Sequence, residues 1–212
     1  MASHARTERA ALADLLSEVG PDAPTLCAGW TTRDLAAHLV VRERRPDSSP
    51  GIVFKPLAGY TDKVRLKAAA RPYEQLVHLV RTGPPRLSLF GIPGVDAAAN
   101  TLEYFVHLED VRRARPDFAP RALDPELTEY LWKRVRTGAK LMLRKVPVGV
   151  ELRRADTADA PVRVRKGEPV VAIAGPPGEL LLYVYGRKDQ ALVTVEGDED
   201  AVRRLRETPT GV

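Results

Sequence analysis

The stretch LEYFVHLED, residues 102–110, carries the strongest pattern in the chain, because apolar and polar residues recur in it at helical spacing. On a helix, residues four apart lie on one face, so Glu103 and His107 are expected to point toward the same place. Val106 and Asp110 share that stripe, which indicates that it faces the interior. A buried carboxylate is costly unless something neutralises it, and a metal ion is one of the few groups that does. The stretch therefore predicts a helix that supplies two metal ligands.

The stretch WTTRDLAAHL, residues 30–39, predicts a third ligand on an earlier helix. A threonine serves as the N-cap, and Asp34 lies in the first turn, where a negative charge favours the positive helix end. His38 then falls on an apolar face, where an imidazole needs a partner. Two histidines and one carboxylate, with a fourth position open, form the ligand set of a catalytic zinc site. We therefore expect His38, Glu103 and His107 to bind a divalent metal, with Zn²⁺ as the expected ion.

Each of the three residues also has a simpler interpretation. A single histidine on an apolar helix face is usually a core residue that is hydrogen-bonded to a carbonyl group. Glu103 and His107 alone form an ordinary polar pair, which stabilises a helix by a few tenths of a kcal/mol. The spacing between His38 and Glu103 does not show that the two helices meet. The metal prediction thus depends on the three side chains lying together.

Composition and charge argue against several classes of protein. The 212 residues include 33 basic and 28 acidic side chains, but these are interleaved, and no nucleic-acid motif accompanies the formal net charge of +5. No apolar run approaches the roughly 20 residues that span a bilayer, and the N-terminus lacks the apolar block of a signal peptide. The single cysteine, Cys27, cannot form an internal disulfide and has no charge pattern that marks a nucleophile. We expect a cytoplasmic protein without nucleic-acid or membrane partners.

The patterning divides the chain near residue 146. Amphipathic helical segments fill the first two thirds, and the last of them begins at Asp124-Pro125, with an N-cap and a first-turn proline. Beyond it, short segments alternate with period two, as half-buried strands do, and two short helical segments accompany them. We expect an α+β protein with a helical bundle over residues 1–146 and a small α/β domain over residues 147–212.

Three passages carry a likeness to a known family: residues 29–38, residues 103–113, and residues 182–187 together with 195–198. The chain resembles the mycothiol-dependent maleylpyruvate isomerase family, whose N-terminal domain is a DinB-like four-helix bundle. The passages occur in the family's order and span nearly the whole chain. In that family a histidine on the second helix and a glutamate and histidine four apart on a later helix hold a divalent metal, usually zinc. The resemblance implies the same three ligands, His38, Glu103 and His107.

The resemblance also implies a thiol-dependent reaction. The open metal position would take the sulfur of mycothiol, a small cytoplasmic thiol of actinobacteria, as a thiolate. That thiolate could add to an electron-poor double bond, as in an isomerase, or displace a leaving group, as in a thiol transferase. Arg187 is expected to hold a carboxylate of the substrate or of the thiol, and is thus a catalytic and a cofactor-binding candidate. Asp34 and Asp110 are candidates for orienting the two imidazoles.

Two other functions stay open at this point. One is a metal-dependent hydrolase, in which water takes the fourth position and Asp110 or Glu109 acts as general base, although the chain has no HExxH motif. The other is a non-enzymatic protein that the metal stabilises and that binds a small ligand or partner. The leading interpretation is the thiol-dependent isomerase or transferase, with a small-molecule thiol and an electrophilic substrate as partners. It is compatible with a monomer or a homodimer.

Overall fold

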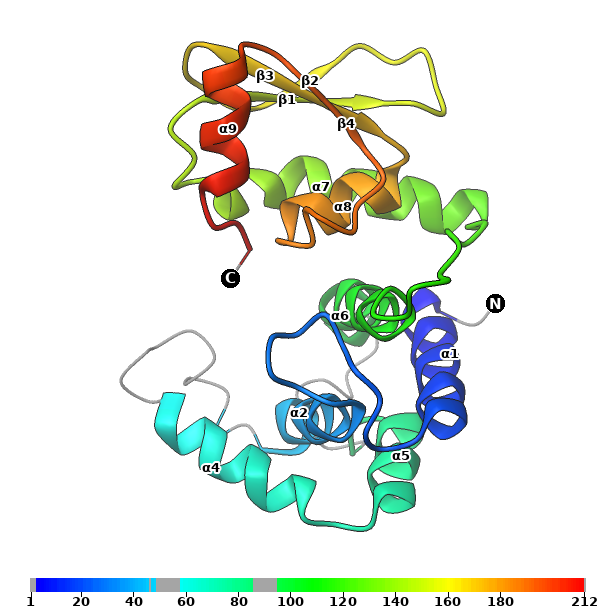
Figure 1. Ribbon diagram of the computed structural model, residues 1–212. Coiled ribbons are helices and arrows are strands. Elements are labelled where there is room, and N and C mark those ends of the chain that lie inside the picture. The colour runs from blue at the N-terminus through cyan, green and yellow to red at the C-terminus, as the bar shows by residue number, and fades with distance from the viewer. Residues whose placement is uncertain (1–2, 46, 49–57, 86–94, 212) are drawn as a thin grey trace. The chain divides into compact units, whose positions relative to one another are not determined.

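The structure is a computed structural model that describes residues 3–45, 47–48, 58–85 and 95–211, with the backbone alone for residues 95–99. The chain divides into two compact units, Met1–Pro120 and Arg121–Val212. The described part of the first unit is helical, and the second combines helices with a four-stranded sheet (Figure 1). This α+β architecture is the fold class expected from the sequence.

The helices of the first unit follow the amphipathic segments of the sequence. Within the described residues they are α1 (His4–Val19), α2 (Thr32–Arg44), α4 (Ala58–Ala69), α5 (Tyr73–Thr82) and α6 (Val95–Arg112). α2 begins at a capping box, in which the Asp34 carboxylate accepts hydrogen bonds from the Thr31 amide and hydroxyl at 3.2 and 3.1 Å. α5 ends at Gly83, whose φ of +72° is the left-handed conformation that favours glycine. The threonine N-cap expected for the helix that carries His38 is therefore present.

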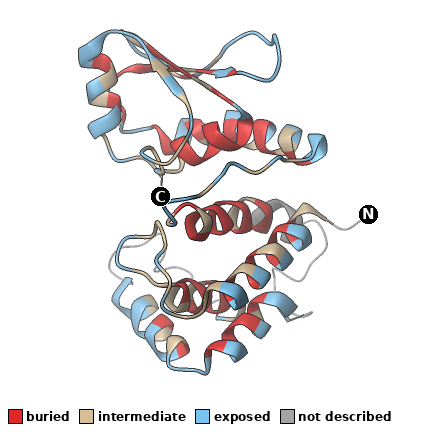
Figure 2. Ribbon diagram, turned by 45° about the vertical axis from the view of Figure 1, so that its right-hand side comes forward, coloured by how far each residue is buried: buried red, intermediate tan, exposed pale blue. Residues whose placement is uncertain are grey.

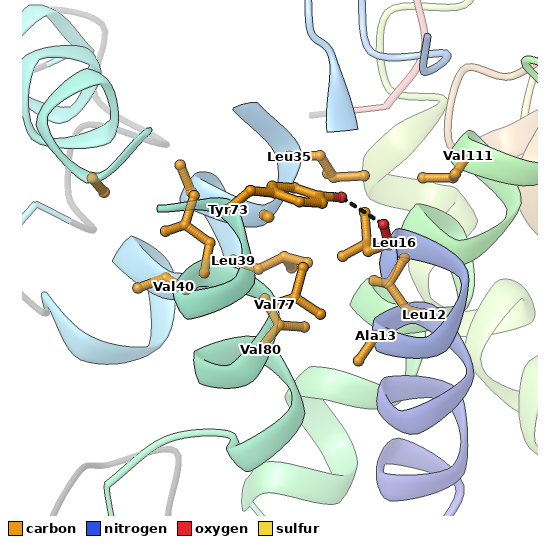
Figure 3. Packing of buried hydrophobic residues seen from close by; sticks show 14 of the residues in the cluster. Leu12, Ala13, Leu16, Leu35, Leu39, Val40, Tyr73, Val77, Val80 and Val111 are labelled. Atoms are coloured by element: carbon orange, nitrogen blue, oxygen red, sulfur yellow. Dashed lines mark hydrogen bonds between the residues drawn. The ribbon is translucent and has the colours of Figure 1, made fainter. Parts of the chain in front are cut away.

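The core of the first unit lies where the apolar stripes of its helices meet (Figure 2). α1 packs against α5 and α6, and α2 packs against α4 and α5. Figure 3 shows Leu16 of α1 and Leu39 of α2 close to Val77 of α5, and each of these side chains is buried. The Tyr73 hydroxyl donates a hydrogen bond to the Leu16 carbonyl oxygen at 2.9 Å, so the one polar group of that ring is satisfied. Burial of each such leucine stabilises the fold by about 1.5–3 kcal/mol.

The second unit is built on a sheet of order β2-β1-β3-β4. Its strands are β1 (Gly149–Arg154), β2 (Val162–Arg165), β3 (Val170–Gly175) and β4 (Thr194–Glu196). The central strands β1 and β3 run parallel, and each pairs antiparallel with an outer strand. Leu152 and Ile173 lie opposite each other on the central strands and are fully buried, which explains the apolar character of those two segments.

Helix α7 (Pro125–Met142) lies in the second unit, whereas the sequence pattern predicted it in the N-terminal bundle, with a division near residue 146. It packs against α8 (Pro177–Val184) and β2, and α9 (Glu199–Glu207) packs against β3. Asp124 is its N-cap, as expected, and accepts a hydrogen bond from the Leu127 amide at 2.8 Å. The apolar stripe of α7 gave the helix correctly, but an amphipathic pattern does not say which surface it covers.

Among the described residues, no helix has the combination of length and apolar character that crossing a membrane requires.

Candidate metal centre

His38 and the pair Glu103–His107 come from two helices, α2 and α6, and their side chains converge. The Glu103 Oε1 atom lies 3.3 Å from Nε2 of His38 and 3.3 Å from Nε2 of His107. The two imidazole rings stand edge to face, with centroids 5.5 Å apart and an angle of 72° between their planes. One carboxylate oxygen is thus shared by two imidazoles from different helices, as the three-ligand prediction requires.

The electrostatics of this cluster favour a charged carboxylate. Burial acts to raise the pKa of Glu103, but hydrogen bonds from His107 and His38 and the charge of Arg42 outweigh it and hold that pKa well below its usual value. Burial lowers the pKa of His38, despite its hydrogen bond with Glu103. Burial also acts to lower the pKa of His107, but hydrogen bonds with Asp110, Cys27 and Glu103 raise it well above the usual value. The cluster therefore offers an ionised carboxylate beside one histidine that prefers its neutral form.

The geometry of the three side chains fits a divalent cation. One ligand atom from each lies within 4.8 Å of the other two. In a tetrahedral site with bonds of about 2.0–2.1 Å, ligand atoms are about 3.4 Å apart. The two distances of 3.3 Å from Glu103 to the imidazoles match that value. One imidazole nitrogen from each histidine and one carboxylate oxygen are also the donor types that zinc binds. These residues could hold a metal with little rearrangement.

The opposite nitrogen of His107 is held by Asp110, one of the two residues expected to orient an imidazole. Nδ1 of His107 lies 2.9 Å from Oδ2 of Asp110, which is fully buried. A carboxylate that accepts from Nδ1–H fixes the orientation of the ring, so that Nε2 faces Glu103. Asp110 also accepts a hydrogen bond from the Cys27 thiol at 3.3 Å. Sequence reasoning gave Cys27 no role, because only the folded loop brings it beside α6.

Asp34, the other candidate for orienting an imidazole, is engaged elsewhere. Its carboxylate caps α2 through Thr31 and forms an ion pair with Arg65. The Arg65 guanidinium lies over the Trp30 ring, 5.0 Å from its centroid, and that ring lies 5.2 Å from the His38 ring. Asp34 is therefore linked to His38 indirectly, through Arg65 and Trp30.

Arg42 is a site residue to which the sequence analysis assigned no role. Its Nε atom lies 3.4 Å from Oε1 of Glu103, and its guanidinium also donates a hydrogen bond to the buried side chain of Asn100. Arg42 follows His38 by four residues on α2, so the same helical spacing that paired Glu103 with His107 could have found it. A guanidinium at this place holds the carboxylate in position and keeps it ionised.

Arg187 lies in the second unit, just after α8. Its Nη1 atom donates a hydrogen bond to the carbonyl oxygen of Tyr185 at 2.7 Å. The role of Arg187 as a catalytic and cofactor-binding residue stays a prediction.

The family described as "Mycothiol maleylpyruvate isomerase N-terminal domain" matches residues 2–158. A crystal structure of the mycothiol-dependent maleylpyruvate isomerase is similar, with a TM-score of 0.63, 14% identity and 92% of each chain covered. A histidine-to-alanine mutant of that enzyme matches with a TM-score of 0.54, 14% identity and the same coverage.

At 14% identity these two structures establish the likeness of the fold. No curated protein is a significant match. The family match covers well over half of the chain, including the segments that carry His38, Glu103 and His107. On that match, the chain belongs to the mycothiol maleylpyruvate isomerase family defined by this N-terminal domain.

Proposed function

We propose that this chain is a metal-dependent enzyme that uses mycothiol. It either isomerises a small electrophilic substrate or transfers the thiol onto that substrate. The observation that carries the proposal is the shared oxygen of Glu103, 3.3 Å from Nε2 of both His38 and His107. Family membership supplies the class of reaction, because the solved relative is a mycothiol-dependent maleylpyruvate isomerase. The proposed ion is Zn²⁺, and the proposed location is the cytoplasm.

The proposed chemistry divides between the cation and the residues around it. A divalent cation lowers the pKa of a thiol that it binds, so that the thiol reacts as a thiolate. His38, Glu103 and His107 would hold the cation, and a set of three protein ligands would leave a position for sulfur. Arg42 fixes the Glu103 carboxylate, and Asp110 fixes the orientation of His107.

Arg187 is proposed to bind a carboxylate of the substrate or of the thiol. A guanidinium binds a carboxylate through two parallel hydrogen bonds, which orients it as well as neutralising it. Replacement of Arg187 by Lys keeps the charge and removes that bidentate geometry. We expect the Lys variant to raise the KM for the carboxylate-bearing partner while metal content stays unchanged.

The surroundings of α6 give less support to a metal-dependent hydrolase. Such an enzyme needs a general base near the metal, and Glu109 and Asp110 were the candidates. The Glu109 carboxylate is held by Arg112 at 3.0 Å and by Arg113 at 2.6 Å. Asp110 faces Nδ1 of His107, on the side of the ring away from Glu103. Glu109 is thus neutralised by two arginines and Asp110 is engaged by His107, which makes each less suited to act as a general base.

Cobalt substitution with added mycothiol tests the proposal. The protein is first changed Cys27→Ser, so that the chain contains no thiol of its own. Addition of mycothiol to the Co²⁺-loaded variant is expected to produce a sulfur-to-cobalt charge-transfer band, and the further change His38→Ala is expected to remove it. An unchanged cobalt spectrum at saturating mycothiol would contradict the thiol-dependent function. Ester or amide hydrolysis without thiol would favour a hydrolase. The absence of both the charge-transfer band and hydrolysis would favour a binding protein.

A further inference from the structure

His107 lies between two groups of potential metal ligands, one at each ring nitrogen. Nε2 faces Glu103 and His38. These two residues and His107 are called the His38 set. Nδ1 faces Asp110 and Cys27, which together with His107 we call the Cys27 set. In the Cys27 set, the distances are 2.9 Å from Nδ1 to Oδ2 of Asp110, 3.9 Å from Nδ1 to Sγ, and 3.3 Å from Sγ to that oxygen.

The three atoms of the Cys27 set are spaced like ligands of one cation. A tetrahedral ion with metal–sulfur bonds of about 2.3 Å and metal–nitrogen or metal–oxygen bonds of about 2.0–2.2 Å separates its ligand atoms by about 3.4–3.6 Å. The observed distances of 2.9, 3.3 and 3.9 Å lie on both sides of that range. A small shift of the sulfur and the carboxylate would equalise them.

The burial and charge of the Cys27 set favour a soft divalent ion. Asp110 is fully buried, and the side chain of His107 is 11% exposed. A thiolate and a carboxylate together neutralise two positive charges, whereas the His38 set supplies one negative charge through Glu103. Burial of a cation is less costly when its charge is balanced, and a thiolate selects ions with high affinity for sulfur.

The loop before α2 is built to hold Cys27 at this place. The Cys27 amide donates a hydrogen bond to the Thr25 hydroxyl at 3.2 Å, and the Trp30 amide donates to the Cys27 carbonyl oxygen at 2.9 Å. The Leu26 amide donates to the Asp110 carbonyl oxygen at 3.1 Å, which ties the loop directly to α6. The sulfur is therefore positioned by backbone hydrogen bonds on both sides of it.

We propose that Cys27, His107 and Asp110 form a second cation site, specific for thiophilic divalent ions, that shares His107 with the His38 set and is occupied in alternation with it. Nothing in the proposed thiol-dependent reaction requires this site. Binding there breaks the Cys27 S–H bond, forms a metal–sulfur bond and releases the proton to solvent, without any change of oxidation state. The proton on Nδ1 of His107 is released to solvent as well, and the neutral ring keeps its proton on Nε2, which donates a hydrogen bond to Glu103.

Alternation follows from the chemistry of the imidazole. A neutral ring has one nitrogen lone pair available and carries its proton on the other nitrogen. An ion at Nε2 leaves Nδ1–H to donate to Asp110, whereas an ion at Nδ1 leaves Nε2–H to donate to Glu103. One ion per chain is therefore the expected maximum, whichever set holds it.

Cd²⁺ titration of the His38→Ala variant tests the proposal. This change removes a ligand from the His38 set and leaves the Cys27 set intact. We expect about one Cd²⁺ per chain, with a sulfur-to-cadmium charge-transfer band in the ultraviolet. Because the chain has one cysteine, that band has one source. The double variant His38→Ala, Cys27→Ser is the matched control, and it should lose the band and bind Cd²⁺ at least about tenfold more weakly.

Two results would overturn the proposal. The first is a His38→Ala variant that is folded by circular dichroism and shows no sulfur-to-cadmium band at saturating Cd²⁺, which would make Cys27 only a hydrogen-bond donor that helps to orient Asp110. The second is the binding of two ions at once by the unchanged protein, which would exclude sharing of His107. The conservative Cys27→Ala variant in the same background guards against a folding defect of the serine. The outcome is independent of the response to mycothiol, because that response is measured without Cys27.

Discussion

The two units bury polar groups to very different extents, although both have apolar cores. In the described part of the first unit the buried charged side chains are Glu8, Arg9, Glu43, Arg65, His107, Glu109, Asp110 and Arg113. In the second unit they are Arg154 and Glu179. A buried charge destabilises a fold unless it is paired, so the first unit depends more than the second on ion pairs and on groups that can bind charge. The first unit is where we place the chemistry.

Two clusters of charged side chains in the first unit differ in kind. The cluster at Glu103 brings together groups that bind cations. In a second cluster, one turn along α2, Arg9 and Glu43 form an ion pair at 3.0 Å. The Glu43 carboxylate also accepts a hydrogen bond from the Tyr104 hydroxyl at 2.5 Å. Its charges already balance, and Tyr104 is fully buried. We infer that the second cluster holds α1, α2 and α6 together, and that the first is available for a ligand. The following predictions test this division.

The largest effect is expected at His107. Replacement by Ala removes the residue that both proposed ligand sets require, so stoichiometric metal should be lost while the helical content is retained. Catalytic-type sites contribute less to folding than structural zinc sites do. Elemental analysis and circular dichroism measure the two quantities. The exposed histidine of α5, His78, provides the matched control, and its Ala variant should keep its metal. Retention of one tightly bound metal by the His107 variant would contradict the ligand set.

The next effect is expected at Glu43 and should appear in stability rather than in metal content. Replacement by Ala leaves Arg9 buried without its carboxylate partner, which costs about 3–5 kcal/mol. Thermal and denaturant unfolding of the first unit measure this loss in the free energy of unfolding. Replacement of the exposed Glu74 by Ala should change stability by less than about 0.5 kcal/mol. Equal effects of the two changes would mean that the second cluster is not what holds these helices.

A smaller effect is expected at Arg42, which contacts Glu103 without being a proposed ligand. Replacement by Met should weaken metal binding by about 10–100-fold, because the carboxylate loses the group that holds it. Isothermal titration with Zn²⁺ measures this loss. Arg81, an exposed residue paired with Asp14 at 2.7 Å, serves as control, and its Met variant should bind Zn²⁺ normally. Unchanged affinity of the Arg42 variant would place the arginine outside the metal centre.

The smallest effect is expected in the second unit, at the N-cap of α7. Replacement of Asp124 by Ala removes the hydrogen bond to the Leu127 amide and should cost about 1 kcal/mol of stability. Asn is an equally good cap, so Asp124→Asn should restore most of it. Thermal unfolding measures both. Metal content should stay the same in both variants, and a loss of metal on this change would contradict the separation of roles between the two units.

The parts of the site that sequence could predict are those set by local spacing. Glu103 and His107 lie four apart on one helix, and the helix brings them together wherever it packs. His38 required the family resemblance as well, because its contact with Glu103 depends on how α2 and α6 pack. Cys27 could not be predicted, because a loop closed by its own hydrogen bonds carries it to Asp110. The sequence separation of Cys27 and Asp110 does not show how close their side chains lie in the folded protein.

The same contrast applies to the fold. The helices and strands follow from periodicity and caps, as the start of α7 at Asp124 shows. The partner of α7 did not follow, since its buried stripe, which includes Leu131 and Val135, would suit either a helical bundle or a sheet-bearing unit. Periodicity reports that a face is covered, and three-dimensional packing decides what covers it.

Gly83 limits how the end of α5 can change during evolution. A methyl group on its α-carbon would lie 2.7 Å from the Nη1 atom of Arg9, and the backbone there already has a positive φ. Any other residue would both distort the turn and push the guanidinium away from Glu43. Natural variation should therefore be rarer at this position than at the surface helix positions around it, although Gly83 touches no ligand and lies far from α2 in the sequence.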